Sequence, residues 1–421
     1  NAQLSRMWRL GYRDEAGRML IVRDPVLPSD AFLGVKYLLE STPIRGLERM
    51  DEIGSFSGRS VYRNPYAVPM AFVYDGAKLP TRHYENTFVY QNALFSTLTG
   101  RKTELYTPLS WTRYNEGDKS YYSIFVPEGN YLAYGNLLWS SKKTGMMSIN
   151  GAKPYGYCRW MSPAAFLIRS REEQAQSEEE ESLQAVRKRA AAEAAAQEAA
   201  MEGTGEGETG LQGAENGDSD AAGTQAADAA EAEEEADTLQ PAAQAYDAKE
   251  LEKLDRAEYA DVRTVVFQSE EGLQFKDYQF YGLDLDALRE ASETIQAGEV
   301  SDVTIENGHF ACTLEGTRGK SLCLLVPWSK GWEAFRNGEQ VQPDTVAGTM
   351  ITIPLLDGRN EIELTYHIPY LREGWYVSLA ALAALLIDIL CRKLSGRKKK
   401  TKNRKIEREK ENGTAYRRNH P

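Results

Sequence analysis

Aromatic side chains are the residues of this chain whose types and spacing best fit a chemical role, the binding of sugars. Trp328 and Trp332 flank a Ser-Lys-Gly turn, and Tyr278 and Tyr281 lie just before an expected helix. Flat, rigid rings can cover the apolar C–H faces of sugar rings at a low cost in side-chain entropy. These four residues are therefore candidates for a glycan-facing platform. The alternative is that they pack in the core between neighbouring domains.

Other side chains with chemical potential give weaker patterns. Asn92, which follows Gln91, is a candidate for binding a polar ligand or for capping a helix. The four histidines are not paired at metal-ligand spacing, so we predict no metal site and no cofactor held by this segment. The run Gly54-Ser55-Phe56-Ser57-Gly58 resembles a nucleophile elbow, but a phenylalanine stands where the serine is required. We assign no catalytic residue.

Four cysteines are too few for a disulfide scaffold in a chain of 421 residues. Cys312 and Cys323 are a special case, because a two-residue turn at Thr317-Arg318 would place them opposite each other on neighbouring strands. They would then share an apolar face, which favours two buried free thiols. A cross-strand disulfide is the alternative, at the wider separation of a hydrogen-bonded pair.

The C-terminal part holds an apolar segment that predicts a transmembrane helix over residues 372–391. The run Trp375–Cys391 has 17 residues and one ionisable side chain, Asp388. This length lies near the lower limit of about 17 residues for a spanning helix. We expect Asp388 to pair with Arg392 at the i,i+4 spacing of a helix. A buried core helix is the alternative interpretation.

Charge is segregated along the chain, whose net charge is −12. Residues 392–421 carry 13 Lys/Arg and 3 Asp/Glu, whereas residues 171–259 carry 7 and 25. Positive charge marks the cytoplasmic side of a membrane helix, so we expect the tail inside, against anionic membrane lipid, and residues 1–370 outside. The acidic run repels phosphate and the basic run directly follows the apolar helix, so neither run indicates a nucleic-acid partner.

Residues 171–259 consist mainly of Ala, Glu, Gly, Asp and Gln. Such a composition buries too little apolar surface to offset its ordering entropy, so we expect a disordered acidic insert that is transiently helical in its first part. Residues 1–30 show no signal-peptide pattern. Because extracytoplasmic domains need export, we interpret the chain as the C-terminal part of a longer polytopic protein. A cytosolic protein with a tail anchor is the alternative.

Turn signals predict that most of the remaining chain is β-structure. Asn150-Gly151, Asn307-Gly308, Asn337-Gly338 and Asp357-Gly358 each lie between strand-like runs, which is the strongest short-range signal for a hairpin. Three helices are also expected, at residues 31–39, at residues 90–99 before Gly100, and from an Asp284 or Asp286 cap to Ala297.

The predicted fold class is mainly β with a few helices. It comprises two β-sandwich or jelly-roll-like extracytoplasmic domains, a disordered acidic insert and one C-terminal transmembrane helix. The expected boundaries are an α/β lead-in region at 1–100, a first β-sandwich at 101–170 plus 260–280, the insert at 171–259, a connecting helix at 281–298, a second β-sandwich at 299–368, the transmembrane helix at 372–391 and a basic cytoplasmic tail at 392–421.

Four short motifs in this order resemble the YfhO family of bacterial membrane proteins. The resemblance covers nearly the whole chain except the acidic insert, which departs from the family pattern, and the tail. The motifs are Phe32-Leu33-Gly34-Val35-Lys36-Tyr37, Gln91-Asn92-Ala93-Leu94 with Leu98-Thr99-Gly100, Phe280-Tyr281-Gly282-Leu283-Asp284, and Val326-Pro327-Trp328-Ser329-Lys330-Gly331-Trp332 with Asn337-Gly338.

The resemblance implies a polytopic protein similar to the C-type glycosyltransferases. Such proteins are associated with adding sugars from a polyprenyl-phosphate donor to envelope polymers such as lipoteichoic acid. Their catalytic acidic residue lies on an early outer loop that has no counterpart in these motifs, so this segment alone is expected to be inactive. The implied partners are a cell-envelope glycopolymer and an N-terminal transmembrane region of the same protein. A non-enzymatic, membrane-anchored module that binds glycan or protein is the alternative.

Overall fold

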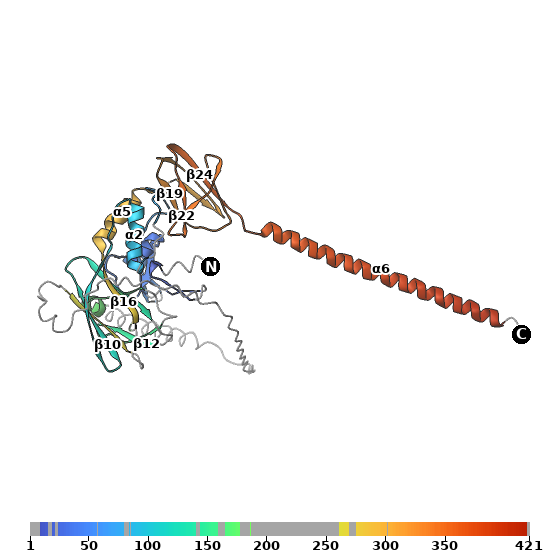
Figure 1. Ribbon diagram of the computed structural model, residues 1–421, viewed down its shortest axis with the longest axis horizontal. Coiled ribbons are helices and arrows are strands. Elements are labelled where there is room, and N and C mark those ends of the chain that lie inside the picture. Colours follow the sequence, from blue (N-terminus) through green and yellow to red (C-terminus); the bar gives the residue numbers. More distant parts are fainter. Residues whose placement is uncertain are drawn as a thin grey trace, which may run out of the picture. The chain divides into compact units, whose positions relative to one another are not determined.

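The computed structural model describes residues 9–15, 19–21, 24–56, 58–79, 84, 86–139, 144–158, 165–176, 186, 261–268, 275–300 and 302–418. Antiparallel sheets joined by a few helices make up this part of the chain (Figure 1), which confirms the predicted mainly β class. Most of the predicted disordered insert lies outside the described residues. Its first residues, 171–176, are helical, as the sequence indicated.

The chain divides into two compact units. The larger unit comprises residues 1–303, 312–328 and 342–361, and the smaller comprises residues 304–311, 329–341 and 362–421. Short elements near the start of the larger unit are β1 (Arg13–Glu15), β2 (Met19–Ile21), α1 (Leu27–Phe32), β3 (Tyr37–Glu40), β4 (Glu48–Arg49), η2 (Asp51–Ile53), β5 (Ser55–Phe56), β6 (Arg59–Arg63) and β7 (Ala71–Tyr74).

The helix predicted at residues 31–39 is wrong in its position. Helix α1 begins earlier, with a proline in its first turn, and ends at Phe32. Gly34 then adopts a left-handed backbone with φ of 69°, where a side chain would collide with Leu325. The chain turns there and continues as β3, which pairs with β6. The segment after Phe32 therefore forms a turn and a strand, because Gly34 ends the helical conformation.

The other two predicted helices are confirmed. Helix α2 (Thr87–Thr99) starts at Asn86, whose side chain accepts hydrogen bonds from the backbone of Phe88 and Val89, and it ends at Gly100 in the left-handed conformation. Helix α5 (Leu285–Gln296) is capped in the same way by Asp284. Together with α1 these helices enclose the helical cluster, whose aromatic members are Tyr12, Phe32, Tyr66, Phe72, Tyr74, Tyr84, Phe88, Tyr90, Phe95, Tyr106, Tyr134 and Tyr281.

Two antiparallel sheets of the larger unit pack around a second core. One has the order β13-β12-β15-β10-β9 and the other β14-β11-β16-β8. The bounds are β8 (Tyr106–Pro108), β9 (Ser110–Glu116), β10 (Lys119–Val126), β11 (Tyr131–Trp139), β12 (Thr144–Ile149), β13 (Tyr155–Cys158), β14 (Ala165–Ile168), β15 (Asp261–Gln268) and β16 (Phe275–Asp284). The core between them, the sandwich cluster, consists of Leu109, Trp111, Tyr122, Ile124, Val126, Ala133, Met147, Phe166, Ile168, Val265, Phe267 and Phe280.

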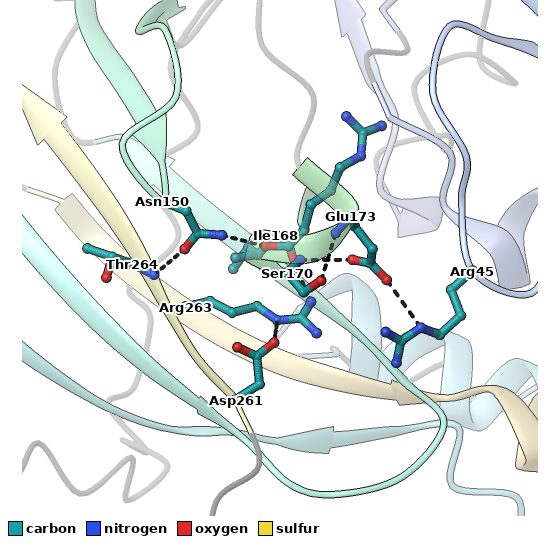
Figure 2. Close-up of polar contacts among 9 residues, drawn as sticks. Arg45, Asn150, Ile168, Ser170, Glu173, Asp261, Arg263 and Thr264 are labelled. Atoms are coloured by element: carbon teal, nitrogen blue, oxygen red, sulfur yellow. Dashed lines mark hydrogen bonds and ion pairs between the residues drawn. The ribbon is translucent and has the colours of Figure 1, made fainter. Parts of the chain in front are cut away.

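The acidic insert leaves this pair of sheets after β14 and the chain returns at β15, where Figure 2 shows a group of polar contacts. The backbone N–H of Ser170 donates to Glu173 Oε2 at 2.8 Å, and the backbone N–H of Glu173 donates to Ser170 Oγ at 3.1 Å. This reciprocal pair is a capping box. The fully buried Arg263 donates to the Ile168 carbonyl and, at 2.8 Å, to Asp261 Oδ2.

Two further contacts tie the same place to the rest of the unit (Figure 2). Glu173 forms an ion pair with Arg45 at 3.2 Å. The Asn150 side chain accepts from the backbone N–H of Thr264 and donates to the Arg169 carbonyl, both at 2.8 Å. Asn150 also forms the predicted hairpin turn with Gly151, between β12 and β13. Both ends of the insert are therefore fixed to the sheets by side chains.

The remaining strands form two more sheets, of order β17-β18-β24-β20-β21 and β22-β23-β19-β7. The bounds are β17 (Val303–Glu306), β18 (His309–Gly316), β19 (Ser321–Pro327), β20 (Trp332–Arg336), β21 (Glu339–Val341), β22 (Asp344–Val346), β23 (Met350–Pro354) and β24 (Gly358–Tyr366). The hairpins predicted at Asn307-Gly308 and Asn337-Gly338 are confirmed. Those predicted at Thr317-Arg318 and Asp357-Gly358 are wrong, because in each case the flanking strands belong to different sheets.

The pairing predicted for Cys312 and Cys323 is corrected by this arrangement. Cys323 on β19 lies opposite Thr352 of β23 and Phe72 of β7, and not opposite Cys312 on β18. Both thiols are buried and free, which agrees with the interpretation that the sequence favoured over a disulfide. Burial raises the pKa of the Cys312 thiol to about 11, so this group stays protonated at neutral pH.

The smaller unit ends in one long helix, α6 (Leu371–Arg418), which is continuous through the basic tail (Figure 1). Among the described residues, its segment Leu371–Lys393 is the one helix of 18 residues or more that is apolar enough to cross a membrane. Asp388 forms the predicted ion pair with Arg392, at 2.8 Å between Oδ2 and Nε. The predicted membrane segment is therefore confirmed as a helix of sufficient length and composition.

Candidate functional site

The structure describes the side chains of three of the four aromatic sugar-binding candidates. Tyr281 is 7% exposed, belongs to the helical cluster and accepts a hydrogen bond from Asn86 Nδ2 at 3.1 Å. Trp332, in the smaller unit, is partly exposed and packs against Tyr366 with ring centroids 5.1 Å apart. Trp328, in the larger unit, is partly exposed on the chain that leaves β19. The side chain of Tyr278 on β16 lies outside the described residues.

Asn92 holds two backbone segments together. Its Oδ1 accepts from the backbone N–H groups of Leu105 and Tyr106, each at 2.9 Å, and its Nδ2 donates to the Tyr106 carbonyl at 2.9 Å. These bonds fix the start of β8 against the middle of α2. The residue that caps this helix is Asn86, so Asn92 serves as a clamp inside the fold.

The larger unit has a concave site that was not apparent from the sequence, a cleft of about 620 Å³. It lies where β7, α2 and α5 end and where β18 turns toward β19. Four separate segments contribute to its wall. The lining residues are Val73, Tyr74, Asp75, Leu98, Thr99, Thr294, Ala297, Gly298, Glu299, Val300, Asp302, Thr313, Leu314, Glu315, Thr317 and Lys320.

Hydroxyl and carboxylate groups dominate the polar side chains of the cleft. Four carboxylates, those of Asp75, Glu299, Asp302 and Glu315, stand against one cation, Lys320. The C-terminal ends of α2 and α5 also line the cleft, and a helix C-terminus carries partial negative charge. Among the described residues no three His, Cys, Asp or Glu side chains gather closely enough to hold a metal ion. The cleft therefore suits a polyhydroxylated ligand that is neutral or cationic, and it repels phosphate.

The wall of the cleft is held by contacts between its helices. Asp75 lies so close to Gly100 that a side chain at that position would collide with its carboxylate. Gly100 therefore serves both the left-handed end of α2 and the approach of Asp75. Arg101 donates to Thr294 Oγ1 at 3.3 Å and forms an ion pair with Glu290 at 2.8 Å, which joins the end of α2 to α5. The site is thus preformed on fixed elements.

A smaller pocket of about 160 Å³ shares Tyr74 and Lys320 with the cleft. Lys78 and Asp344 close one side of it with an ion pair of 2.6 Å. Hydrogen bonding to Lys78 lowers the pKa of the Asp344 carboxyl, so this group stays ionised. Burial raises the pKa of Tyr74 to about 12, so its hydroxyl keeps its proton, and it interacts with Thr352 and Ser321.

A second unusual group, Asp30, lies in α1 beside the helical cluster. It is 6% exposed and accepts a hydrogen bond from the Tyr12 hydroxyl, while its Oδ2 has no partner among the described residues. Burial raises the pKa of the Asp30 carboxyl to about 6. The hydroxyl of Tyr106, which interacts electrostatically with this carboxyl, also has no partner among the described residues. The Asp30 carboxyl can therefore bind and release a proton inside the fold.

Comparison with known families supplies one match. Residues 244–378 match the family model described as bacterial membrane protein YfhO. No curated protein and no solved structure is similar to the chain. The matched segment runs from before β15 to the first part of α6, and so it contains one side of the cleft and the start of the apolar helix. The match and the apolar helix together identify a membrane-associated protein.

Proposed function

We propose that this chain, which over residues 244–378 belongs to the YfhO family of bacterial membrane proteins, holds the saccharide acceptor for a glycosyltransferase-like protein of the cell envelope. In this proposal α6 anchors the chain, the globular part stands outside the membrane and the basic tail lies in the cytoplasm. Sugar transfer from a polyprenyl-phosphate donor takes place in a membrane region that precedes this segment, and the acceptor is an envelope polymer such as lipoteichoic acid.

The observation that carries the proposal is the composition of the cleft. Its hydroxyls and carboxylates can accept and donate hydrogen bonds to the many hydroxyl groups of a sugar chain. Tyr74 lines both the cleft and the smaller pocket. Because the walls are fixed by α2 and α5, little ordering is required when a ligand binds.

The charge of the cleft indicates which part of such a polymer it holds. Four carboxylates and two helix C-termini disfavour a polyanionic backbone. The cleft would therefore take the sugar portion of the acceptor and leave phosphate groups, including that of the donor, to another part of the protein. This division is consistent with an accessory role, in which the chain binds and positions the acceptor.

Two substitutions in the cleft test the proposal. In the full-length protein, Asp302→Asn combined with Glu315→Gln removes two carboxylates with little change in volume, and Glu104→Gln, an exposed position outside the cleft, is the matched control. We expect the double variant to lower the sugar content of the wall polymers in cells that lack the native gene, and the control to restore it. An unchanged sugar content after deletion of the gene itself would reject sugar transfer.

The same strains also distinguish sugar transfer from the alternative function, that of a glycan-binding module. If deletion leaves every sugar unchanged while the purified chain still binds envelope glycan, the protein is a membrane-anchored binding module without transferase activity. Sidedness is measured independently, in a variant whose four native cysteines are replaced by serine: a single cysteine is introduced at Ser123 or at Thr401 and labelled in intact cells with a reagent that does not cross membranes. Our proposal requires labelling at the first position and protection at the second.

A further inference from the structure

The outer face of the five-stranded sheet carries a row of side chains that the sandwich core does not use. The register pairs Tyr121 of β10 with Tyr114 of β9 on one side and with Val266 of β15 on the other, and Val266 pairs with Ser148 of β12. Successive residues on a strand point to opposite faces. Their neighbours belong to the buried sandwich cluster: Tyr122, Val265 and Met147. The row therefore faces away from the core.

The two tyrosines of this row are stacked. Their ring centroids are 4.4 Å apart and their planes differ by 2°. Since neighbouring strands lie about 4.8 Å apart, the rings stand upright on the sheet, with their faces turned along the direction that crosses the strands. Tyr114 covers one face of the Tyr121 ring, and the other face is turned toward β15. Tyr114 itself is 54% exposed.

The floor in front of Tyr121 is made of small side chains. Val266 and Ser148 continue the row, and the next row along the strands pairs Ser123 with Thr264. All four residues are partly exposed. On the other side, Gln268 pairs with Met146, which is 41% exposed. An upright aromatic wall thus borders a shallow floor of hydroxyl, amide and apolar groups.

The chemistry of this face favours one class of ligand. A pyranose ring has an apolar C–H face, which fits the ring face of Tyr121 that Tyr114 does not cover, and a rim of hydroxyls, which the floor can hydrogen-bond. Charged residues border this face beyond the floor: Lys119 lies opposite both Glu116 and Gln268, and Gln268 donates to Asp118. The four residues Val266, Ser148, Ser123 and Thr264 are themselves uncharged. A neutral floor gives an anionic lipid surface or a charged peptide no complementary charge.

We infer that the stacked pair Tyr114–Tyr121 and the floor formed by Val266, Ser148, Ser123 and Thr264 are a saccharide-binding subsite that takes a neutral pyranose ring. The inference rests on the proposed function, which supplies a glycan as the ligand. It adds a second site, which binds the sugar through ring stacking, whereas the cleft binds it through hydroxyl and carboxylate groups.

Binding of neutral oligosaccharides to the 421-residue chain in nanodiscs tests the subsite. The probes are hexamers of β-linked glucose and of N-acetylglucosamine, and the readout is the dissociation constant from calorimetry. We expect Tyr121→Ala to weaken binding about tenfold, because an aromatic contact contributes about 1–1.5 kcal/mol. Tyr121→Phe keeps the ring face and should bind as the native chain does.

Two further variants test whether a loss of oligosaccharide binding is specific to the subsite. Tyr37→Ala removes a tyrosine that is 57% exposed on β3, in another sheet, and it should leave binding unchanged. Ser123→Arg leaves both rings in place but fills the floor, and it should weaken binding as much as Tyr121→Ala. Equal affinity of Tyr121→Ala and the native chain, or no binding of either hexamer by the native chain, would overturn the subsite. The proposed function is judged separately, by the wall-polymer sugar content after gene deletion.

Discussion

The two buried clusters of the larger unit are built on different principles. The sandwich cluster consists of apolar and aromatic side chains between two sheets, and the charged group buried beside it is Arg263, which is paired with Asp261. The helical cluster is similarly aromatic, but Asp30 lies beside it with a hydrogen bond from Tyr12 and a raised pKa. The first cluster stabilises the fold at any pH through burial of apolar surface. The second makes the stability of the same unit depend on pH.

The largest expected effect is a cavity in the sandwich cluster. Phe166 is fully buried and its ring packs directly on Gly135. Phe166→Ala should lower the free energy of unfolding by about 3–5 kcal/mol, and by the same amount at pH 5 and pH 8. Urea denaturation followed by circular dichroism measures both. Phe56→Ala, at a site 55% exposed, is the control and should cost less than about 0.5 kcal/mol. A loss of stability in Phe166→Ala that differs between pH 5 and pH 8 would contradict the view that the sandwich cluster stabilises the fold independently of pH.

The next effect belongs to Asp30. Its pKa rises from 3.8 to about 6 on folding, so the folded state binds the proton more tightly than the unfolded chain does. The resulting stabilisation is complete below pH 3.8 and is lost as the pH rises through about 6, a difference of about 3 kcal/mol. Asp30→Asn mimics the protonated acid. We expect the variant to match the native chain near pH 4 and to be the more stable of the two at pH 8.

Glu40 should keep the stability of the Asp30→Asn variant dependent on pH. Burial raises the pKa of the Glu40 carboxyl to about 7, so it also favours the folded state at low pH and remains in the variant. The urea midpoint measured from pH 4 to pH 8 should therefore fall less steeply for Asp30→Asn than for the native chain, without becoming level. Parallel curves for the two proteins would show that Asp30 does not titrate in this range.

Two tyrosines of the helical cluster provide a smaller and sharper test. The Tyr134 hydroxyl donates to the Pro25 carbonyl at 2.9 Å, whereas the Tyr106 hydroxyl has no partner among the described residues. Tyr134→Phe leaves a buried carbonyl unsatisfied and should cost about 1–2 kcal/mol. Tyr106→Phe should be neutral or stabilising, since it removes a buried hydroxyl that is not hydrogen-bonded. The reverse order in the urea midpoints would contradict the hydrogen-bond assignment.

The smallest effect comes from the surface and sets a baseline for both clusters. Arg63 and Glu48 form an ion pair between β6 and β4, with both side chains about half exposed. Glu48→Gln should cost less than about 1 kcal/mol in low salt, and 1 M salt should abolish the difference. A cost as large as that of Tyr134→Phe would mean that this surface pair is better ordered than its exposure indicates.

Local signals in the sequence predicted the elements whose structure is decided locally. The end of α2 at Gly100 and the Asp284 cap of α5 were predicted, because such signals act on backbone groups only a few residues away. The Asn86 cap of α2 was missed, and with it the first turn of that helix. Two of the three Asn-Gly or Asp-Gly turns after the insert form hairpins for the same reason. The apolar helix and its Asp388–Arg392 pair were also predictable, since both depend on spacing within one segment.

Pairings between distant segments were not predictable. A turn signal at Asp357-Gly358 shows that the chain reverses, but it does not show which sheet the next strand joins. Strand β7 pairs with β19, about 250 residues later, and no local pattern indicates this partner. The cleft was missed on the same grounds, because Asp75, Glu299 and Glu315 come from segments that meet only in the folded chain.

The capping box at Ser170 and the buried Arg263 have an evolutionary consequence. They secure the two borders of the break between β14 and β15 from within the sheets, independently of what lies between. The entropic cost of closing a loop grows slowly with its length, by only about 0.6 kcal/mol for each doubling. Insertions and deletions between β14 and β15 should therefore cost the two sheets little stability and be tolerated in evolution.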